Sequence, residues 1–451
     1  MSLDKIFSPK SIAVIGATPR KDSLGRGLFK NVLEYQIFKK EAKIYPINPN
    51  RKKVLGKKTF SSVLNIKEDI DLAIIAVPAQ IVPKVVKECC QKKVGGMIVV
   101  SAGFAEAGGK GKILQDKILS IVQKNKIPII GPNALGIIRP PLNLNVSFSP
   151  ATPKKGKIAI ISQSGAIINS IIDKSLLEDY GFSTIISSGN EADLKISDFL
   201  EWLKQDKETK VITLYIEGIT DGKKFLKAAK EISKTKPIIA IKVGKSEIGK
   251  KSISSHTGAL AGSYEIYKAA FKKTGIFEVE TIDELLDSAK VLVLQPKCKN
   301  GIGIITNGGG YGILMADYCE NLGIKLAKLK RKTIEKIDKS AVMHPAWSRS
   351  NPVDILGDAS PQRYRVAIEA LLEQENIYGL LIIETLQIMT KPIENAKMII
   401  EAHKKYPKKP IICCFLGGKL TASGIKLLER NKIPNFLEPK RGALAMKALI
   451  L

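Results

Sequence analysis

Cysteine and histidine are scarce in this sequence, and long apolar runs are missing from it. Its 451 residues contain six Cys and three His, without a Cys-x-x-Cys pair or a His, Cys and carboxylate set at metal-ligand spacing. This argues against a disulfide scaffold, and we expect no metal site. Apolar runs such as 158–161 fall far short of the ~18 residues of a membrane helix. We identify no signal peptide and expect a cytoplasmic protein that does not contact membranes.

Arginine is also scarce, although the chain is strongly basic. The formal net charge is +29, yet only ten of the 72 basic residues are Arg. Nucleic-acid readers favour clustered Arg, whereas these lysines are spread along the chain. We therefore expect no nucleic-acid partner, and a surface that attracts anionic metabolites. No G-x-x-x-x-G-K-[ST] motif is present, so the chain lacks a P-loop.

Apolar β-branched runs alternate with helical patterns along the whole chain, which is typical of parallel α/β sheets. Three such series predict three doubly wound domains, with residues 1–130, 157–296 and 300–451, and a turn-rich linker over 131–156. Strands are expected at 11–15, 43–47, 72–77, 96–100, 127–130, 157–161, 182–187, 211–216, 237–242, 301–306, 379–383 and 410–415. We expect a long loop over 243–257.

Ligands of such sheets bind beyond the carboxyl ends of strands, where helix N-termini attract anions. The first such turn contains Gly16 and Gly25 but is not G-x-G-x-x-G. The second strand is followed by Arg51, Lys52 and Lys53 instead of the acidic residue that NAD requires. These cations fit either NADP or the 3′-phosphate of coenzyme A, and a purely structural turn is a third possibility.

Two further strand–turn–helix junctions are candidate anion sites. Ser162–Gly165 offers hydroxyls and backbone N–H groups, but Ser is also an ordinary N-cap. Asn307–Gly312 holds four glycines, whose entropic cost is more readily explained by the close approach of an anion than by a plain turn.

His256 lies among small and hydroxylic residues at the end of the expected loop. A neutral imidazole is a nucleophile toward phosphoryl groups, and it needs a carboxylate that fixes its tautomer. Glu217, after the strand 211–216, is the candidate. An exposed carboxylate and a plain loop histidine are the alternatives. Lys242, Lys245, Lys250 and Lys251 either steer this segment or form a solvated lysine-rich surface.

Taken together, these motifs resemble the NDP-forming acyl-CoA synthetases, which include succinyl-CoA synthetase. The nearest likeness is to the α subunit of the ADP-forming acetyl-CoA synthetases, and it covers essentially the whole chain. Ser-His-Thr-Gly-Ala-Leu-Ala-Gly around His256 is the most specific motif, and Asn351-Pro352-Val353-Asp354 is another. Asn169 departs from succinate-specific relatives, which places succinate in doubt.

The resemblance implies a Rossmann-like CoA-binding domain followed by two flavodoxin-like domains. It implies that His256 is phosphorylated and that Glu217 orients the phosphohistidine. The implied phosphate-binding residues of two paired helices are Ser162, Gln163, Ser164, Gly165, Asn307, Gly308, Gly309 and Gly310. The expected CoA contacts are Gly16, Ala17, Thr18, Pro19, Ser23, Gly25, Arg26, Asn48, Pro49, Lys52, Val77, Pro78, Ser101, Ala102, Gly103, Phe104 and Asn133. Among these, Lys52 rests on its charge alone.

The implied reaction converts acyl-CoA, ADP and phosphate to acid, CoA and ATP through acyl phosphate and phosphohistidine. ADP or ATP, with Mg²⁺, is expected on a separate ATP-grasp β subunit, in an α2β2 assembly. Two alternatives remain: a non-catalytic sensor of CoA or a dinucleotide, and an NADP-linked oxidoreductase, against which the missing G-x-G-x-x-G argues. The acyl group, the choice between ADP and GDP, and a relay histidine on the partner stay open.

Overall fold

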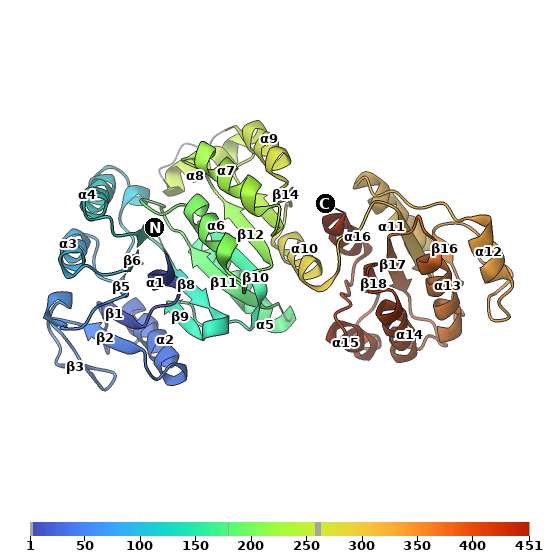
Figure 1. Ribbon diagram of the computed structural model, residues 1–451, viewed down its shortest axis with the longest axis horizontal. Coiled ribbons are helices and arrows are strands. Elements are labelled where there is room, and N and C mark those ends of the chain that lie inside the picture. The colour runs from blue at the N-terminus through green and yellow to red at the C-terminus, as the bar shows by residue number, and fades with distance from the viewer. Residues whose placement is uncertain (1–2, 179, 258–262, 451) are drawn as a thin grey trace. The chain divides into compact units, whose positions relative to one another are not determined.

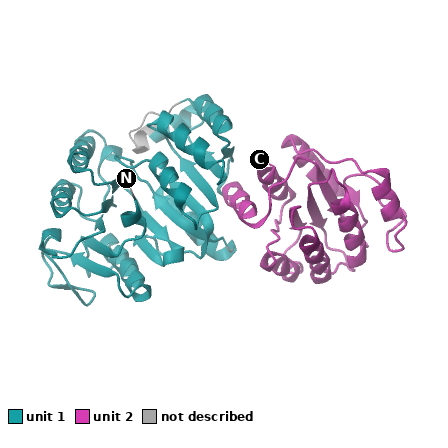
Figure 2. Ribbon diagram, viewed as in Figure 1, with its two compact units in different colours: residues 1–282 teal, residues 283–451 magenta. Residues whose placement is uncertain are grey.

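In the computed structural model, the chain forms two compact units, residues 1–282 and 283–451 (Figure 2). The structure describes residues 3–178, 180–257 and 263–450, and the side chains of residues 254–257 lie outside this description. Within the described part of the chain, no helix has the length and the apolar character needed to cross a membrane.

The first unit starts with a five-stranded parallel sheet in the order β2-β1-β5-β6-β7 (Figure 1). Its strands are β1 (Ser11–Ile15), β2 (Lys43–Ile47), β5 (Leu72–Ile75), β6 (Gly96–Val99) and β7 (Ile129–Ile130). The sequence predicted all five, with ends that differ by no more than two residues. Their isoleucines and valines are mostly buried, as expected for strands covered on both faces.

Helices cover both faces of this sheet. They are α1 (Asp4–Phe7), α2 (Leu24–Phe38), α3 (Val82–Lys92) and α4 (Gly109–Asn125). Side chains of α1 and α2 share a core with Ile12 and Val14 of β1, whereas those of α3 and α4 share a core with Ala13 and Ile15. Alternate residues of one strand therefore face opposite helix layers, which is the expected doubly wound arrangement.

A second sheet of the first unit has the order β14-β13-β12-β10-β11-β8-β9, and β8 and β9 are its antiparallel strands. The strands are β8 (Gly136–Arg139), β9 (Leu144–Ser147), β10 (Lys155–Ser162), β11 (Phe182–Ser187), β12 (Val211–Ile216), β13 (Ile238–Lys242) and β14 (Phe277–Glu278). Its helices are α5 (Gly165–Glu178), α6 (Ile196–Gln205), α7 (Gly222–Ile232), α8 (Glu247–Thr257) and α9 (Tyr264–Thr274).

Two sequence-based expectations for this region were wrong. The segment 131–156 is not a plain linker, because it contains the fully buried strands β8 and β9. Two of its prolines, Pro140 and Pro141, lie in the short turn between these strands, Pro140–Leu142. The segment 243–257 is not a loop throughout, since α8 occupies Glu247–Thr257. An i,i+3 ion pair of 2.6 Å between Glu247 and Lys250 supports the first turn of α8.

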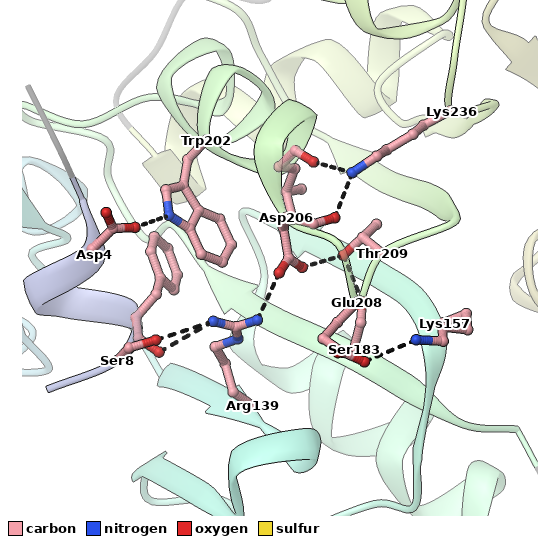
Figure 3. Close-up of polar contacts among 12 residues, drawn as sticks. Asp4, Ser8, Arg139, Lys157, Ser183, Trp202, Asp206, Glu208, Thr209 and Lys236 are labelled. Atoms are coloured by element: carbon pink, nitrogen blue, oxygen red, sulfur yellow. Dashed lines mark hydrogen bonds and ion pairs between the residues drawn. The ribbon is translucent and has the colours of Figure 1, made fainter.

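A buried cation ties the N-terminal helix to the second sheet (Figure 3). Arg139, the last residue of β8, pairs with Asp206 at 2.8 Å, and both side chains are only 6% exposed. The Arg139 guanidinium lies 4.9 Å from the ring centre of Trp202 in α6, and that ring stacks on Phe7 of α1. Because removal of one partner leaves a buried charge, such a pair is costly to break.

The second unit has a four-stranded parallel sheet in the order β16-β15-β17-β18. The strands are β15 (Ile302–Thr306), β16 (Val353–Asp354), β17 (Gly379–Glu384) and β18 (Ile411–Phe415). The helices are α10 (Ile282–Leu294), α11 (Gly309–Asn321), α12 (Arg331–Asp338), α13 (Pro361–Glu373), α14 (Pro392–Lys405), α15 (Ala422–Arg430) and α16 (Pro439–Leu449). The guanidinium of Arg441 holds α16 to α10 through two hydrogen bonds of 2.6 and 2.9 Å to Asp287.

Candidate active site

Helix α5 begins at the carboxyl end of β10, at the predicted turn Ser162–Gly165. The Ser162 hydroxyl accepts the backbone N–H of Ser164 at 3.0 Å and donates to its carbonyl at 2.8 Å. The Ser164 hydroxyl in turn accepts the N–H of Ile167 at 3.4 Å, as an N-cap does. The turn is thus held by its own side chains, and the dipole of α5 makes its N-terminus favourable for an anion.

Gln163 joins this turn to the end of β12. Its Oε1 accepts the backbone N–H groups of Glu217 at 2.6 Å and Gly218 at 3.0 Å, and its Nε2 donates to the Gly218 carbonyl at 2.9 Å. The amide of Gln163 therefore fixes the backbone that carries Glu217 relative to the N-terminus of α5. The Gln163 amide is thus hydrogen-bonded to backbone groups. A phosphate would be contacted by other groups of the turn 162–165.

Of the two candidate catalytic residues, the structure describes the side chain of only Glu217. Glu217 directly follows β12 and is 7% exposed, so it is not the exposed carboxylate of the alternative interpretation. His256 lies in the backbone of α8, and its side chain is outside the described residues. The pairing of Glu217 with His256 therefore stays a prediction.

Glu191 is a buried carboxyl near this turn that the sequence analysis did not identify. It follows β11, is 7% exposed, and forms side-chain hydrogen bonds with Ser188 and Gln163. Burial raises the pKa of Glu191 to about 8, against the lowering effect of these hydrogen bonds. In the sequence Glu191 looks like an ordinary polar turn residue, whereas the structure marks it by its burial and by its positive φ of 53°.

The lysines of the 242–251 segment differ from one another. Lys242 is 2% exposed and points into the protein. Lys245 pairs with Glu278 at 2.8 Å, and Lys250 pairs with Glu247. Lys251 is exposed. The solvated-surface interpretation is therefore wrong for Lys242, whose burial had no evident signal beyond its place at the end of an apolar strand.

In the second unit, the turn before α11 repeats the hydrogen-bonding plan of the turn before α5. The Thr306 hydroxyl accepts the Gly308 N–H at 3.0 Å and donates to the Gly308 carbonyl at 2.9 Å. The Asn307 side chain accepts the N–H of Thr385, after β17, at 2.7 Å and donates to its carbonyl at 2.9 Å. Asn307 therefore occupies the role of Gln163.

A carboxylate lies beside the N-terminus of α11. A Cβ atom at Gly309 would lie 2.7 Å from Oδ2 of Asp354, so glycine at this position makes room for that side chain. Gly310 has open space around it, and Gly312 lies close to Thr306. Asp354 comes from the Asn-Pro-Val-Asp motif that the sequence analysis singled out. Close packing against this carboxylate accounts for one glycine of the turn without any ligand.

A second carboxyl, Glu384, is buried at the end of β17. It accepts a hydrogen bond from Nδ2 of Asn395 at 2.5 Å, while its Oε1 and the Oδ1 of Asn395 have no hydrogen-bond partner among the described residues. Burial raises the pKa of Glu384 to about 7, and the Asn395 hydrogen bond opposes this shift. If Oε1 of Glu384 carried a proton, it could donate a second hydrogen bond to Oδ1 of Asn395, so that the acid and the amide would be paired by two hydrogen bonds.

The structure brings four of the predicted CoA contacts together at the end of β1. Gly16 adopts φ +99°, and a Cβ there would lie 2.2 Å from the carbonyl oxygen of Ala76. A Cβ at Gly25 would lie equally close, 2.2 Å, to the carbonyl oxygen of Gly16. The side chain of Asn48 donates to the carbonyl of Ala17 at 2.8 Å. Gly16 is thus required by its positive φ and by the close approach of the chain after β5, and Gly25 by the close packing of α2 on the turn.

Other predicted contacts lie around this turn. Arg26 folds back on it, with Nη1 at 2.6 Å from the carbonyl oxygen of Pro19. Thr18, Pro19 and Ser23 are partly exposed, whereas Pro78 and Lys52 are exposed. These groups are accessible to a ligand.

The predicted contacts after β6 are more enclosed. Ser101 donates to the Val77 carbonyl at 2.6 Å, and its own carbonyl accepts the N–H of Asn133 at 2.9 Å. The N–H groups of Gly103 and Phe104 donate to Oε1 of Glu106 at 2.6 and 3.1 Å. The Phe104 side chain is fully buried in the core shared with α3 and α4, so it does not face a ligand. A cofactor could meet Phe104 only through its backbone.

Within the described residues, no group of three or more His, Cys, Asp or Glu side chains is arranged to hold a metal ion. The described part of the candidate site consists of helix N-termini, the buried carboxyls and the buried ammonium of Lys242. An α/β chain with such turns at the ends of its parallel strands belongs to the class of proteins that handle phosphorylated or nucleotide-like ligands.

Comparison with known proteins identifies the family. Three family models match: a CoA binding domain over residues 10–140, a succinyl-CoA ligase like flavodoxin domain over 155–292, and a Ligase-CoA domain over 302–437. The ADP-forming acetate–CoA ligase of Methanocaldococcus jannaschii is 46% identical over 99% of this chain. The chain spans 63% of that relative's length.

Two further relatives are matched along almost their whole length. The subunit alpha of ADP-forming acetate–CoA ligase II from Pyrococcus furiosus is 42% identical over 99% of this chain and 97% of its own. The solved Korarchaeum cryptofilum acetyl-coenzyme A synthetase 1, in complex with phosphate and ADP, superposes with a TM-score of 0.93 at 34% identity, covering 99% of this chain and 96% of that one. The chain belongs to the ADP-forming acetate–CoA ligase family of the NDP-forming acyl-CoA synthetases.

Proposed function

We propose that this chain is the catalytic α subunit of an ADP-forming acyl-CoA synthetase. In the direction of ATP formation, an oxygen of inorganic phosphate attacks the thioester carbonyl and the CoA thiolate leaves, which gives acyl phosphate. An imidazole nitrogen of His256 then attacks the phosphorus, and the carboxylate leaves as free acid. ADP finally takes the phosphoryl group from His256, which regenerates the free imidazole and gives ATP.

One observation carries this proposal: Gln163 holds the Glu217 turn against the N-terminus of α5 by three hydrogen bonds. These bonds hold the backbone of Glu217, whose side chain is buried, beside the turn that begins α5. A carboxylate suits the positive charge that develops on a phosphorylated imidazole, and the helix end suits the phosphoryl group. The family membership of the chain supports the same roles for Glu217 and His256.

The CoA site is proposed at the carboxyl edge of the first sheet, at the turn of Gly16 and Gly25. The match of residues 10–140 to a CoA binding domain supports this placement. Lys52, which is exposed, is available to the 3′-phosphate. The phosphate-binding roles of Ser162–Gly165 and Asn307–Gly310 are part of the proposal.

ADP, ATP and Mg²⁺ are assigned to a separate ATP-grasp β subunit in an α2β2 assembly. The name of the Pyrococcus relative as a subunit alpha supports a separate partner. Acetate is the first acyl group to test, followed by branched and aryl acids. The low cysteine content is consistent with a reducing cytoplasm.

The first experiment incubates the purified chain with acetyl-CoA and ³²P-phosphate and follows acid-labile label together with thiol release. We expect label on wild-type protein and none on His256→Ala. His344→Asn is the matched control, because His344 is a histidine of the second unit whose Nδ1 accepts the Ala346 N–H at 3.1 Å, a bond that asparagine can keep. A labelled His256→Ala protein that makes ATP with its partner refutes the assignment.

The role of Glu217 is tested separately. Glu217→Gln should slow labelling of His256 while CoA affinity stays unchanged. The control is Glu208→Gln, since Glu208 is a half-exposed carboxylate paired with Lys157. Unchanged labelling removes Glu217 from this role.

The alternatives make different predictions in the same assay. A non-catalytic sensor binds CoA without consuming the thioester. An NADP-linked oxidoreductase binds NADPH in a direct titration, whereas an acyl-CoA synthetase does not.

A further inference from the structure

The side chain of Lys242 ends among backbone carbonyls at the carboxyl edge of the second sheet. Lys242 is the last residue of β13 and is 2% exposed. Its ammonium donates to the carbonyl oxygen of Glu217 at 2.9 Å and to the carbonyl oxygen of Val243. One cation therefore joins the backbone that follows β12 to the backbone that follows β13.

Tyr267 of α9 completes this arrangement. Nζ of Lys242 lies 4.5 Å from the centre of the Tyr267 ring, within the range of a cation–π interaction. The Tyr267 hydroxyl accepts the backbone N–H of Ile219 at 2.9 Å. Lys242 and Tyr267 together connect the turn 217–219, the end of β13 and helix α9.

These connected elements border the part of the chain that carries His256. The segment between Val243 and Tyr267 contains α8, and His256 lies within it. Val243 lies at one end of this segment and Tyr267 beyond its other end. The Lys242 ammonium thus ties both flanks of the segment to the turn that carries Glu217.

A buried ammonium is costly unless its charge or hydrogen bonds are used. Burial lowers the pKa of Lys242 to about 8, and the nearby Glu217 carboxylate opposes this shift. A methionine would fill a similar volume without this cost. The two carbonyl bonds and the ring contact explain why a cation is kept here.

We propose that Lys242 is a positioning residue of the phosphoryl-transfer site. Its ammonium holds the backbone of Glu217 in a fixed position relative to the two chain segments that flank His256. This inference rests on the proposed function for its catalytic meaning. It assigns no contact with substrate to Lys242, which acts through the Glu217 turn.

The test compares Lys242→Met with Lys245→Met in the full chain. Lys245 is the matched control, because it lies three residues further on and pairs with Glu278 instead of the Glu217 turn. We expect Lys242→Met to slow labelling of His256 about tenfold or more, and Lys245→Met to change it less than about twofold. CoA affinity should stay unchanged in both variants.

A double-mutant comparison with Glu217→Gln distinguishes a positioning role of Lys242 from a general effect of the substitution on folding. In a Glu217→Gln background, Lys242→Met should have little further effect on labelling, since its route of action is already lost. If the two effects multiply, Lys242 does not act through Glu217 and the proposal is overturned. Tyr267→Phe, which removes the acceptor of the Ile219 N–H but keeps the ring, covers the case in which Lys242→Met does not fold. It should slow labelling about threefold in wild type and not in the Glu217→Gln background.

Hydrogen exchange of a peptide that covers residues 215–220 gives a readout independent of the reaction. Lys242→Met should speed exchange of the Glu217–Ile219 amides about tenfold, and unchanged exchange contradicts the proposal. If wild-type protein shows no label on His256, the proposed function fails. Faster exchange in the variant would then still establish that Lys242 positions the turn.

Discussion

The turns before α5 and α11 have the same pattern of hydrogen bonds, but the groups next to their first helical glycine differ in charge. In both, a hydroxyl at the end of a strand closes the turn, and the next residue, Gln163 or Asn307, uses its amide to hold the backbone after a neighbouring strand. Gly165 of α5 has Leu135 and Ser187 as its neighbours, whereas Gly309 of α11 has the carboxylate of Asp354.

Because of this difference, a high glycine content does not by itself indicate an anion-binding turn. The turn before α11 is richer in glycine, but one of its glycines makes room for a carboxylate that belongs to the protein itself. A carboxylate near a helix N-terminus takes up part of the favourable dipole interaction that a phosphate would use. At the α5 turn, by contrast, the atoms nearest to Gly165 belong to Leu135 and Ser187, so its first glycine does not face a carboxylate.

The largest effect on labelling of His256 is expected when a carboxylate is introduced at the α5 turn, as Asp354 provides at the α11 turn. Ser164→Asp keeps an N-cap but adds a carboxylate beside the proposed phosphate. At about 4 Å and an effective dielectric constant of about 20, like charges repel by about 4 kcal/mol. Labelling of His256 should fall by at least about 100-fold without loss of thermal stability.

Ser164→Asn is the control for this variant, because it has the same shape without the charge. It should label within a few-fold of wild type. Equal labelling rates for the Asp and Asn variants would show that no anion is bound at α5.

The second prediction concerns the two buried carboxyls near these turns, Glu191 in the first unit and Glu384 in the second. A carboxyl with a raised pKa keeps its proton in the folded chain after the unfolded chain has lost it. For Glu384, stability should therefore fall as pH rises from about 4.5 toward about 7, by on the order of 3 kcal/mol in total. Glu384→Gln mimics the protonated form and should flatten this slope in urea unfolding.

The exposed Glu375 provides the control, since its side chain is 89% exposed. Glu375→Gln should leave the pH slope as in wild type. Glu191→Gln should flatten a slope that extends toward pH 8. If Glu384→Gln keeps the wild-type slope, the carboxyl is not protonated in the folded state.

A third prediction tests whether the two amide bridges are equivalent. Gln163→Leu leaves the N–H groups of Glu217 and Gly218 unpaired, and Asn307→Leu does the same to Thr385. Each should cost about 2 kcal/mol locally, seen as roughly 30-fold faster exchange of those amides. Faster exchange should appear only in the variant's own unit, and a change in both units would show that the turns are not independent.

The smallest effect is expected at α11. Asp354→Asn removes the protein's own negative charge and should tighten binding of inorganic phosphate a few-fold, since one exposed charge near a helix end is worth about 0.3–1 kcal/mol. Calorimetric titration in the Ser164→Asp background isolates this turn from α5. No change in affinity would indicate that the α11 turn does not bind phosphate.

The sequence predicted the longer parallel strands well, because strands buried on both faces are continuous runs of isoleucine and valine, but it missed the two-residue strands β14 and β16. The positions of the turns before α5 and α11 were predicted for the same reason, since each turn follows such a run; anion binding there stays a prediction. The sequence-based prediction failed at β8 and β9, where prolines around two short strands looked like a linker. It also failed at α8, whose serines masked a helix that an ion pair and packing stabilise.

The candidate site was predicted as a set of positions but not as an arrangement. Glu217 and Gln163 follow different strands, and only the folded sheet brings them within hydrogen-bonding distance. The burial of Lys242 and of Glu191 could not be predicted, because burial of a charged residue depends on the tertiary fold. A lysine at the end of a strand is usually exposed, and no local pattern distinguishes this one.

The stacking of Phe7 on Trp202 has a practical consequence for recombinant work. A fragment that ends near residue 130 would retain α1 but lose Arg139 and the helix that α1 packs against. The uncovered aromatic face would promote aggregation. Expression trials aimed at a free-standing ligand-binding module should therefore begin from residues 1–282 and shorten the chain only where Phe7 keeps its cover.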